Sequence, residues 1–382
     1  MRILFLAEAP SPYAREWAAH LASAFGHEVH LASLQEAGPP LAGVTLHPLG
    51  RRLARLGYAA AIPAARRLGA ALSPDVVIAY RVTSYGVLAA AAGLHPLVLA
   101  AQGQHIAYPP ASGWKRALAR YALGRADLVL SWGAHMARNM VKLGCDPEKI
   151  RTVAYGIDVD RYAIDTARAR PGNPPRLLST RAMRRDYNQE QMLRALPEVA
   201  ARHPGVIWTA LGEGPERERL ARLAGELRVA RNLDFPGRVS GERLLALLQA
   251  SDVYLSAVAT DGVSASLLEA MACGAWPVVT DNAANRLWIR PGVTGDLVPA
   301  GDARAMARAI LGALADPGRA AAARAENRAL VADRASLWRN MALIDEMLRA
   351  VAARGLPAVP PVPASLVVPP PAADGASREG AA

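Results

Sequence analysis

Residues 261–280 read DGVSASLLEAMACGAWPVVT and carry the clearest fold pattern of the chain. Its first six residues are small or polar and predict a loop, and the apolar positions that follow predict a short helix. After the turn at Gly274, the run from Trp276 to Thr280 is apolar and rich in β-formers, which predicts a buried strand. A loop, a helix and a buried strand in this order are typical of a parallel sheet covered by helices.

The same alternation extends along the rest of the chain. Short apolar runs and helical stretches follow one another from the first residue, which favours the doubly wound α/β class. Strands are predicted at 2–7, 28–33, 75–79, 97–101, 128–131 and 150–153, and again at 176–179, 205–211, 233–235, 253–256, 276–280 and 295–298. Helices are predicted at 13–25, 114–123 and 135–143, among others.

A break in composition divides the chain. A length of 382 residues with 52% apolar content is sufficient for two cores. Residues 166–175 (TARARPGNPP) are rich in proline and lack periodicity, which predicts a linker between domains at 1–165 and 176–335. Residues 302–354 are almost wholly helical with breaks near Pro317 and Ala335, so a final helix at 336–354 should pack back on the first domain. The proline-rich segment 355–382 is expected to be disordered.

Charge and cysteine content exclude several function classes. The net charge is +11, but 41 of the 44 basic residues are Arg in a chain rich in Ala, Gly and Pro. This bias fits GC-rich coding, so no nucleic-acid partner is expected. Residues 1–170 carry 19 basic and 11 acidic residues, which places most of the excess in the first half. Cys145 and Cys273 are far apart and predict reduced cytoplasmic thiols rather than a disulfide or zinc site.

No segment has the pattern of a membrane span or a secretory signal. The start MRILFLAEAP predicts a first buried strand, and the longest apolar stretch, near 87–101, contains His95 and Pro96. The basic segment 51–67 (RRLARLGYAAAIPAARR) mixes cations with apolar residues, and Pro63 interrupts it. It is either an ordinary amphipathic helix or a surface that contacts anionic lipid headgroups.

Three turns at predicted strand ends are candidates for phosphate binding, because ligands of open α/β sheets lie at the carboxyl ends of strands, near helix N-termini. They are the stretches 212–215 (GEGP), 236–238 (PGR) and 261–266 (DGVSAS). The last also places Asp261 in the loop and Glu269 in an otherwise apolar helix. A lone buried carboxylate is costly, which favours a functional Glu269 over a surface one. Asp261 has a structural alternative as a helix cap.

The stretch 261–280, followed by Asp281 and Gly295, resembles the acidic-x7-acidic signature of retaining glycosyltransferases of family 4. Further stretches resemble the family in order and spacing: YGIDVDRY at 155–162, STR at 179–181, ALGEGP at 210–215, FPGRVS at 235–240 and SDVYLS at 251–256. The resemblance implies a GT-B fold, with two Rossmann-like domains facing a central cleft. The first would bind the acceptor and the second the nucleotide sugar.

The resemblance also implies an activity. It is the retaining transfer of a sugar from a UDP- or GDP-linked donor to a glycan or lipid-linked acceptor in bacterial polysaccharide biosynthesis. No metal ion and no cofactor are expected beyond the donor itself. The enzyme would be cytoplasmic, and its basic first domain could place it on the inner face of an anionic membrane.

Matching positions receive roles from this resemblance. Glu269 would accept both ribose hydroxyls, Asp261 would hold sugar hydroxyls, and Arg181 would neutralise the departing diphosphate. His105 would face the donor sugar. The remaining donor-binding candidates are Gly262, Val263, Ser264, Ala265, Ser266, Gly212, Gly214, Arg238, Val239 and Arg185.

The sequence departs from the family pattern at four places. Asp261 stands for a glutamate, and Asp186 stands for a basic residue that Arg184 or Arg185 would have to replace. The turn at 10–13 (PSPY) lacks the usual glycine pair, and Leu287 stands where many relatives carry an acidic residue. Arg181 lies in an Arg-rich chain, so only its place at a strand end favours function, and His105 could equally be structural or exposed.

Other functions are left as alternatives. A sugar-nucleotide epimerase of the GT-B fold would need additional acid and base carboxylates, and a non-catalytic binding module would explain the departures. Asp158 and Asp160 could form a metal-binding pair, but a turn before the linker is the simpler interpretation. The stretch 212–214 (GEG) lacks the third glycine of a dinucleotide fingerprint, which argues against a nicotinamide enzyme.

Overall fold

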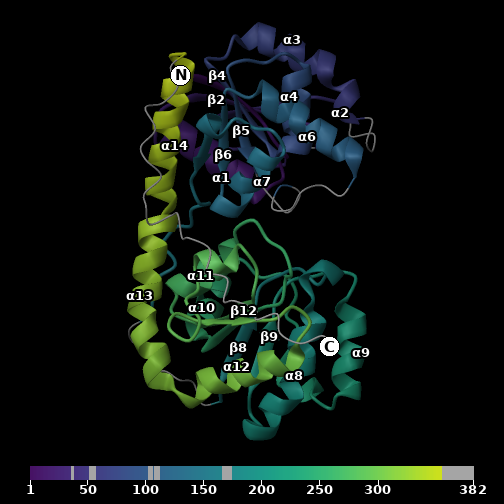
Figure 1. The fold of residues 1–382 in the computed structure, drawn as a ribbon, viewed down its shortest axis with the longest axis vertical. Coiled ribbons are helices and arrows are strands. Elements are labelled where there is room, and N and C mark those ends of the chain that lie inside the picture. Colours follow the sequence, from purple (N-terminus) through teal and green to yellow (C-terminus); the bar gives the residue numbers. More distant parts are fainter. Residues whose placement is uncertain (36–37, 51–56, 102–105, 107–111, 166–173, 355–382) are drawn as a thin grey trace, which may run out of the picture.

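The computed structural model describes residues 1–35, 38–50, 57–101, 106, 112–165 and 174–354, and these form two parallel sheets covered by helices. We call the part built on the first sheet the first lobe and the part built on the second sheet the second lobe (Figure 1). The predicted tail 355–382, nearly all of the predicted linker and the candidate His105 lie outside the described residues.

The first lobe contains a seven-stranded sheet in the order β3-β2-β1-β4-β5-β6-β7, and every pairing in it is parallel. The strands are β1 (Arg2–Leu6), β2 (Glu28–Ser33), β3 (Val44–Pro48), β4 (Val76–Tyr80), β5 (Leu97–Ala101), β6 (Leu128–Ser131) and β7 (Ile150–Thr152). All six predicted strands are present. The edge strand β3 was not predicted.

Helices cover both faces of this sheet. They are α1 (Pro12–Ser23), α2 (Gly57–Ala60), α3 (Ile62–Leu72), the π-helical turn η1 (Arg81–Gly86), α4 (Val87–Ala91), α6 (Gly113–Arg125) and α7 (Ala134–Lys142). In α1 the buried side chains of Ala14, Trp17, Ala18 and Leu21 recur at helical spacing and form its core face. Pro63 lies in the first turn of α3, so the break predicted there is confirmed.

The second lobe contains a six-stranded parallel sheet in the order β10-β9-β8-β11-β12-β13. Its strands are β8 (Arg176–Ser179), β9 (Ile207–Ala210), β10 (Leu233–Asp234), β11 (Val253–Ser256), β12 (Trp276–Thr280) and β13 (Asp296–Val298). Its helices are α8 (Gln189–Arg202), α9 (Arg217–Glu226), α10 (Gly241–Ala250), α11 (Ala265–Ala272) and α12 (Ala303–Ala315), with short turns η3 (Arg185–Tyr187) and η5 (Asn285–Leu287). The predicted doubly wound class is confirmed in both halves.

The last two helices join the lobes. Helix α13 (Pro317–Ala335) runs along the second lobe, and α14 (Leu337–Ala352) continues beside the first, as Figure 1 shows. The breaks near Pro317 and Ala335 fall where they were predicted. Helix α14 packs on α1 and β4 with a buried apolar face, which confirms that it crosses back. Its buried Asp345 lies 2.5 Å from His27 of the first lobe.

Among the described residues, none of the helices is long and apolar enough to cross a membrane. Cys145 and Cys273 are both buried, and neither takes part in a disulfide.

Candidate functional site

The order of the second sheet reverses between β8 and β11, which lie side by side at its centre. The loop after β8 carries Arg181, and the loop after β11 carries Asp261. Ligands of open α/β sheets bind at such a reversal, outside the carboxyl ends of the strands. The structure therefore brings these two predicted residues together at the expected ligand-binding position.

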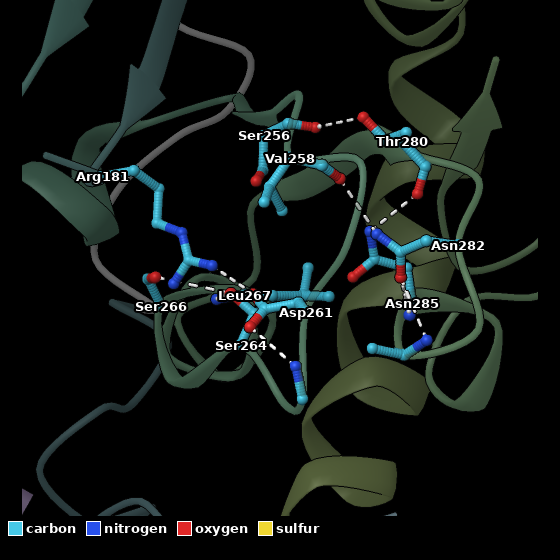
Figure 2. Close-up of polar contacts among 12 residues, drawn as sticks. Arg181, Ser256, Val258, Asp261, Ser264, Ser266, Leu267, Thr280, Asn282 and Asn285 are labelled. Carbon is cyan, nitrogen blue, oxygen red and sulfur yellow. Dashed lines mark hydrogen bonds and ion pairs between the residues drawn. The ribbon is translucent and has the colours of Figure 1, made fainter. Parts of the chain in front are cut away.

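Arg181 and Asp261 form an ion pair between the guanidinium Nη2 and the carboxylate Oδ2 (Figure 2). Both side chains are mostly buried, at 14% and 12% exposure. Burial alone would lower the pKa of Arg181, but the charge of Asp261 and the neighbouring tyrosines raise it above its usual value. The guanidinium also lies over the ring of Tyr187, 4.7 Å from its centre. Arg181 is thus a fixed cation at the strand end.

The backbone around Arg181 is held from two sides. The Gln189 side chain donates to the carbonyls of Arg181 and Ala182, at 3.2 and 2.6 Å. On the other side lie Gly212 and Gly214, with φ of 108° and 158°. A Cβ atom on Gly212 would come within 2.8 Å of the Arg181 carbonyl, and one on Gly214 within 2.2 Å of the Met183 carbonyl. Gly212 and Gly214 therefore allow the loop after β9 to lie against the loop after β8. Their contacts with the nucleotide sugar stay a prediction.

The loop of Asp261 leads into helix α11. Asp261 Oδ1 accepts from the Gly262 amide at 2.9 Å, and the Ser264 hydroxyl caps the helix by accepting from Leu267 N at 3.2 Å. The Ser266 side chain forms a hydrogen bond with the hydroxyl of buried Tyr254. The other predicted loop residues, Gly262, Val263 and Ala265, are buried in the same turn. Gly262 and Val263 precede the N-cap Ser264, and Ala265 begins the first turn of α11, where a helix attracts anions.

A network of amide side chains supports this loop from β12 (Figure 2). Asn282 donates to the Val258 carbonyl at 3.1 Å, and Asn285 donates to the Thr280 carbonyl at 2.7 Å. The Asn282 side-chain oxygen accepts from the Asn285 amide at 2.9 Å. All three polar residues are buried. The loops after β11 and β12 are therefore tied together behind Asp261.

Glu269 lies in the second turn of α11. Burial raises its pKa to about 7, although a hydrogen bond from the Tyr162 hydroxyl and the charges of Arg161 and Arg181 act to lower it. Tyr162 belongs to the YGIDVDRY stretch but was not predicted as a site residue. Glu269 is thus a recessed carboxyl that lies close enough to Arg181 for the guanidinium charge to lower its pKa.

The first lobe supplies residues that the sequence did not single out. Tyr13, at the start of α1, is 37% exposed and meets Tyr155 edge-on, with 4.9 Å between ring centres. Its pKa is raised by burial and by the charges of Glu269 and Asp261. Tyr13 therefore faces the second-lobe site from the PSPY turn, which was noted only for its missing glycines.

His135, in the first turn of α7, spans the two lobes. Its Nε2 donates to the Asp261 carbonyl oxygen at 3.3 Å, and the residue is only 4% exposed. Burial lowers the pKa of His135, which favours the neutral ring. The contact depends on how the lobes meet, so no local sequence pattern could have revealed it.

Leu287, one of the departures from the family pattern, also lies at this junction. A Cβ atom on Gly133 would come within 3.0 Å of the Leu287 methyl group and 2.9 Å of the His135 ring. The two lobes therefore meet here through an apolar contact beside the His135 hydrogen bond.

The remaining predicted residues lie in η3 and in the loop after β10. Arg185 is exposed and lines a cavity of about 420 Å³ between α8 and α9, next to Arg184, which pairs with Asp186 at 3.0 Å. Arg238 is exposed and Val239 is half-buried in the loop after β10. This loop is joined to Gly212, whose amide donates to the Gly237 carbonyl at 2.8 Å.

Asp158 belongs to a turn, as the simpler interpretation predicted. Its Oδ1 accepts from the amides of Asp160 and Arg161, at 3.2 and 3.0 Å. Within the described part of the chain, no cluster of three or more His, Cys, Asp or Glu side chains could hold a metal ion.

Family models match most of the chain. Residues 160–330 match the model of glycosyl transferases group 1, and residues 2–132 match the model of glycosyl transferase 4-like proteins. Among solved structures, Anabaena Alr3699/HepE in complex with UDP-glucose is similar, with a TM-score of 0.77 and 17% identity over 92% of this chain and 100% of that one. The sucrose-phosphate synthase of Thermosynechococcus elongatus gives a TM-score of 0.79 and 19% identity over 93% and 100% of the two chains.

Curated relatives match over a shorter span. The GDP-mannose-dependent alpha-(1-6)-phosphatidylinositol monomannoside mannosyltransferase of Mycolicibacterium smegmatis is 30% identical over 62% of this chain and 65% of its own. The lipopolysaccharide core biosynthesis glycosyltransferase LpsE of Rhizobium meliloti is 34% identical over 42% and 44%. The chain thus spans less than two thirds of the length of either relative.

Proposed function

We propose that the chain is a group 1 glycosyltransferase of the GT-B fold, similar to family 4, and that it transfers a sugar from a UDP- or GDP-linked donor to a glycan or lipid-linked acceptor. The transfer retains the configuration of the sugar and needs no metal ion. The relatives support both donor classes, since one similar structure holds UDP-glucose and one relative is named as GDP-mannose-dependent.

The observation that carries this proposal is the Arg181–Asp261 pair at the N-terminus of α11, with Glu269 recessed in the same helix. An ionised Glu269 would accept hydrogen bonds from the ribose hydroxyls. The amides of the first turn of α11, together with Arg181, would bind the diphosphate. Asp261 would share its oxygens between Arg181 and the hydroxyls of the donor sugar.

In the proposed reaction, the bond between the anomeric carbon and the diphosphate oxygen breaks. The bond to the acceptor oxygen forms on the same face of the sugar, and the acceptor proton passes to the departing diphosphate oxygen. Arg181 stabilises the charge that develops on this leaving group, which is the task a metal ion performs in other transferases. No protein base is required on this route.

We propose a place of action as well. The enzyme works in the cytoplasm and contacts an anionic membrane through its first lobe. Sedimentation with liposomes, with and without anionic lipid, tests the contact. Equal recovery with both kinds of liposome would contradict it.

The activity is tested by incubating the protein with UDP- and GDP-linked sugars and measuring nucleoside diphosphate release. Release supports a transferase, interconversion of the sugar supports the epimerase alternative, and binding without turnover supports a binding module. Arg181→Ala should lower the turnover number by about 10²–10³. Arg339→Ala is the matched control, because its exposed guanidinium pairs with Asp333 where α13 meets α14, and it should change turnover by less than about threefold. Equal effects of the two variants would remove Arg181 from the site.

A further inference from the structure

A groove of about 510 Å³ lies in the first lobe, away from the Arg181 pair. This volume is within the range of small-molecule sites. Its wall is mostly apolar and combines residues of five elements: Tyr58 and Ala59 of α2, Ile62 of α3, Thr83 and Ser84 of η1, Val87 and Leu88 of α4, and Trp114, Lys115 and Leu118 of α6.

The groove lies at the ligand-binding edge of the first sheet. Turn η1 follows β4 directly, and β4 and β1 are the central neighbours at which this sheet reverses its order. The same edge faces the second-lobe site, because His135, after β6, contacts Asp261. Arg81 adopts a left-handed φ of 65° at the end of β4 and pairs with Glu8, after β1, at 2.9 Å. Strained backbone and π-helical turns of this kind cluster at functional sites.

The groove keeps large apolar side chains in contact with solvent. Trp114 is 52% exposed, and the Lys115 ammonium lies 5.6 Å from the centre of its ring. Tyr58 is held edge-on against buried Tyr85, with 5.4 Å between ring centres. An apolar wall with an indole at its rim is suited to a hydrocarbon chain.

The segment of the chain that builds the groove is basic. Residues 57–125 contain seven Lys and Arg residues and a single acidic residue, Asp75. Asp75 precedes β4, at the opposite edge of the sheet, where it accepts from the Arg2 amide at 2.7 Å. The groove therefore lies in a region that attracts anions.

We propose that this groove binds the hydrocarbon chain of a lipid-linked acceptor whose head carries a phosphate, with Lys115 beside the phosphate. The inference rests on the proposed sugar transfer and selects the lipid-linked acceptor from its two alternatives. The occupant is a single lipid molecule, which would lie along α2 and α6 and present its head to the cleft.

Binding of decyl phosphate and hexyl phosphate to the full chain, below their micelle concentrations, tests the proposal. Decyl phosphate should bind more tightly, by up to about fourfold for each additional methylene. Ala59→Trp, at an exposed position in the groove wall, should weaken decyl phosphate binding at least about tenfold. Ala60→Trp is the matched control, because this exposed neighbour does not line the groove.

The head group is tested in the same assay. Lys115→Glu should weaken both alkyl phosphates about tenfold, and the adjacent Arg116→Glu should have less effect. Equal affinity for the two chain lengths, or unchanged binding by Ala59→Trp, would overturn the proposal. Binding to anionic vesicles without binding to monomeric decyl phosphate would also overturn it, since the ligand would then be the membrane surface.

The two proposals fail separately. Decyl phosphate binding needs neither donor nor turnover, so the groove can be refuted while nucleoside diphosphate release is still observed. Loss of release with UDP- and GDP-linked sugars would instead refute the transfer, and chain-length-dependent binding would survive it.

Discussion

The environment of Glu269 disfavours its charged form, because the carboxyl is recessed in an apolar helix. Its pKa of about 7 means that a proton is readily held when no ligand is present. Ribose hydroxyls are donors, and the ionised carboxylate is their better acceptor. Ligand binding and the protonation of Glu269 are therefore coupled.

This coupling predicts a pH dependence of nucleotide binding. Between pH 6 and pH 8 the ionised fraction of Glu269 rises from about a tenth to about nine tenths, so the affinity for UDP or GDP should rise by up to about tenfold. Glu269→Gln should bind more weakly and remove this dependence. Titration calorimetry at several pH values measures both. A parallel pH profile in the variant would assign the dependence to the phosphates of the ligand.

The same residue affects stability in the opposite direction. The pKa of Glu269 in the native protein lies above its ordinary value of 4.5, so the native state holds the additional proton between about pH 4.5 and 7. The stabilisation from this residue is complete below that window and is lost as the pH rises through 7. Nucleotide binding then restores stability above pH 7, because it uses the charged form.

Some site residues could be predicted from the sequence, and others could not. Arg181 and Asp261 were predicted because each follows a strand, and adjacent strand ends meet at one edge of the sheet. Tyr13 and His135 were not predicted as site residues, since their importance arises only when the second lobe is placed against the first. A strand end can be inferred locally, but a contact between lobes cannot.

At the scale of elements, the loops that carry the site are shaped by close backbone approach. Gly214 allows its loop to lie against Met183, next to Arg181, and Ala cannot replace it without a shift. Gly225, inside α9, has open space around it. Gly214→Ala should therefore lower the free energy of unfolding by about 1–3 kcal/mol. Gly225→Ala should raise it by about 0.5–1 kcal/mol. Urea denaturation compares them, and a stable Gly214→Ala variant would show that the loops can separate.

Helix α14 is attached to the first lobe by a buried pair that has an exposed counterpart elsewhere. The His27–Asp345 contact has side-chain exposures of 1% and 10%, whereas His95 and Asp127 pair at 44% and 45%. His27→Ala should cost about 3–5 kcal/mol, because it leaves Asp345 partly uncompensated in the interior. His95→Ala should cost less than about 1 kcal/mol. Equal shifts in the denaturation midpoint would mean that α14 is held by its apolar face alone.

Some helices and strands could be predicted from the sequence more readily than others. The start of α13 was predictable because Pro317 lies in its first turn. Strand β3 was not predicted because it is partly exposed along its length and ends at Pro48. It lies at the edge of the sheet, where a proline is tolerated. The strands that position the site are central and almost wholly buried, so they were the most predictable part of the fold.

At the scale of the whole molecule, the two lobes share buried surface. Leu178, Tyr254 and Leu267 of the second lobe belong to one continuous apolar cluster with the core of the first. Helices α13 and α14 bridge the lobes along one side (Figure 1). The junction of His135 with Asp261 lies at the donor loop itself, so the geometry of this loop depends on the first lobe.

This dependence predicts that His135 positions the donor loop without binding the nucleotide. His135→Phe keeps the ring but removes the donor, which leaves the Asp261 carbonyl without that hydrogen bond. Amide hydrogen exchange of residues 257–264 should then increase about tenfold, and the turnover number should fall by a similar factor. The affinity for UDP or GDP should change by less than about twofold. His135→Gln restores an N–H donor of similar reach and should recover most of the turnover, and His203→Ala on the second lobe serves as the control. If exchange in 257–264 is the same in His135→Phe and the unmodified protein, the loop is held by the second lobe alone, through Arg181 and the amide network behind it.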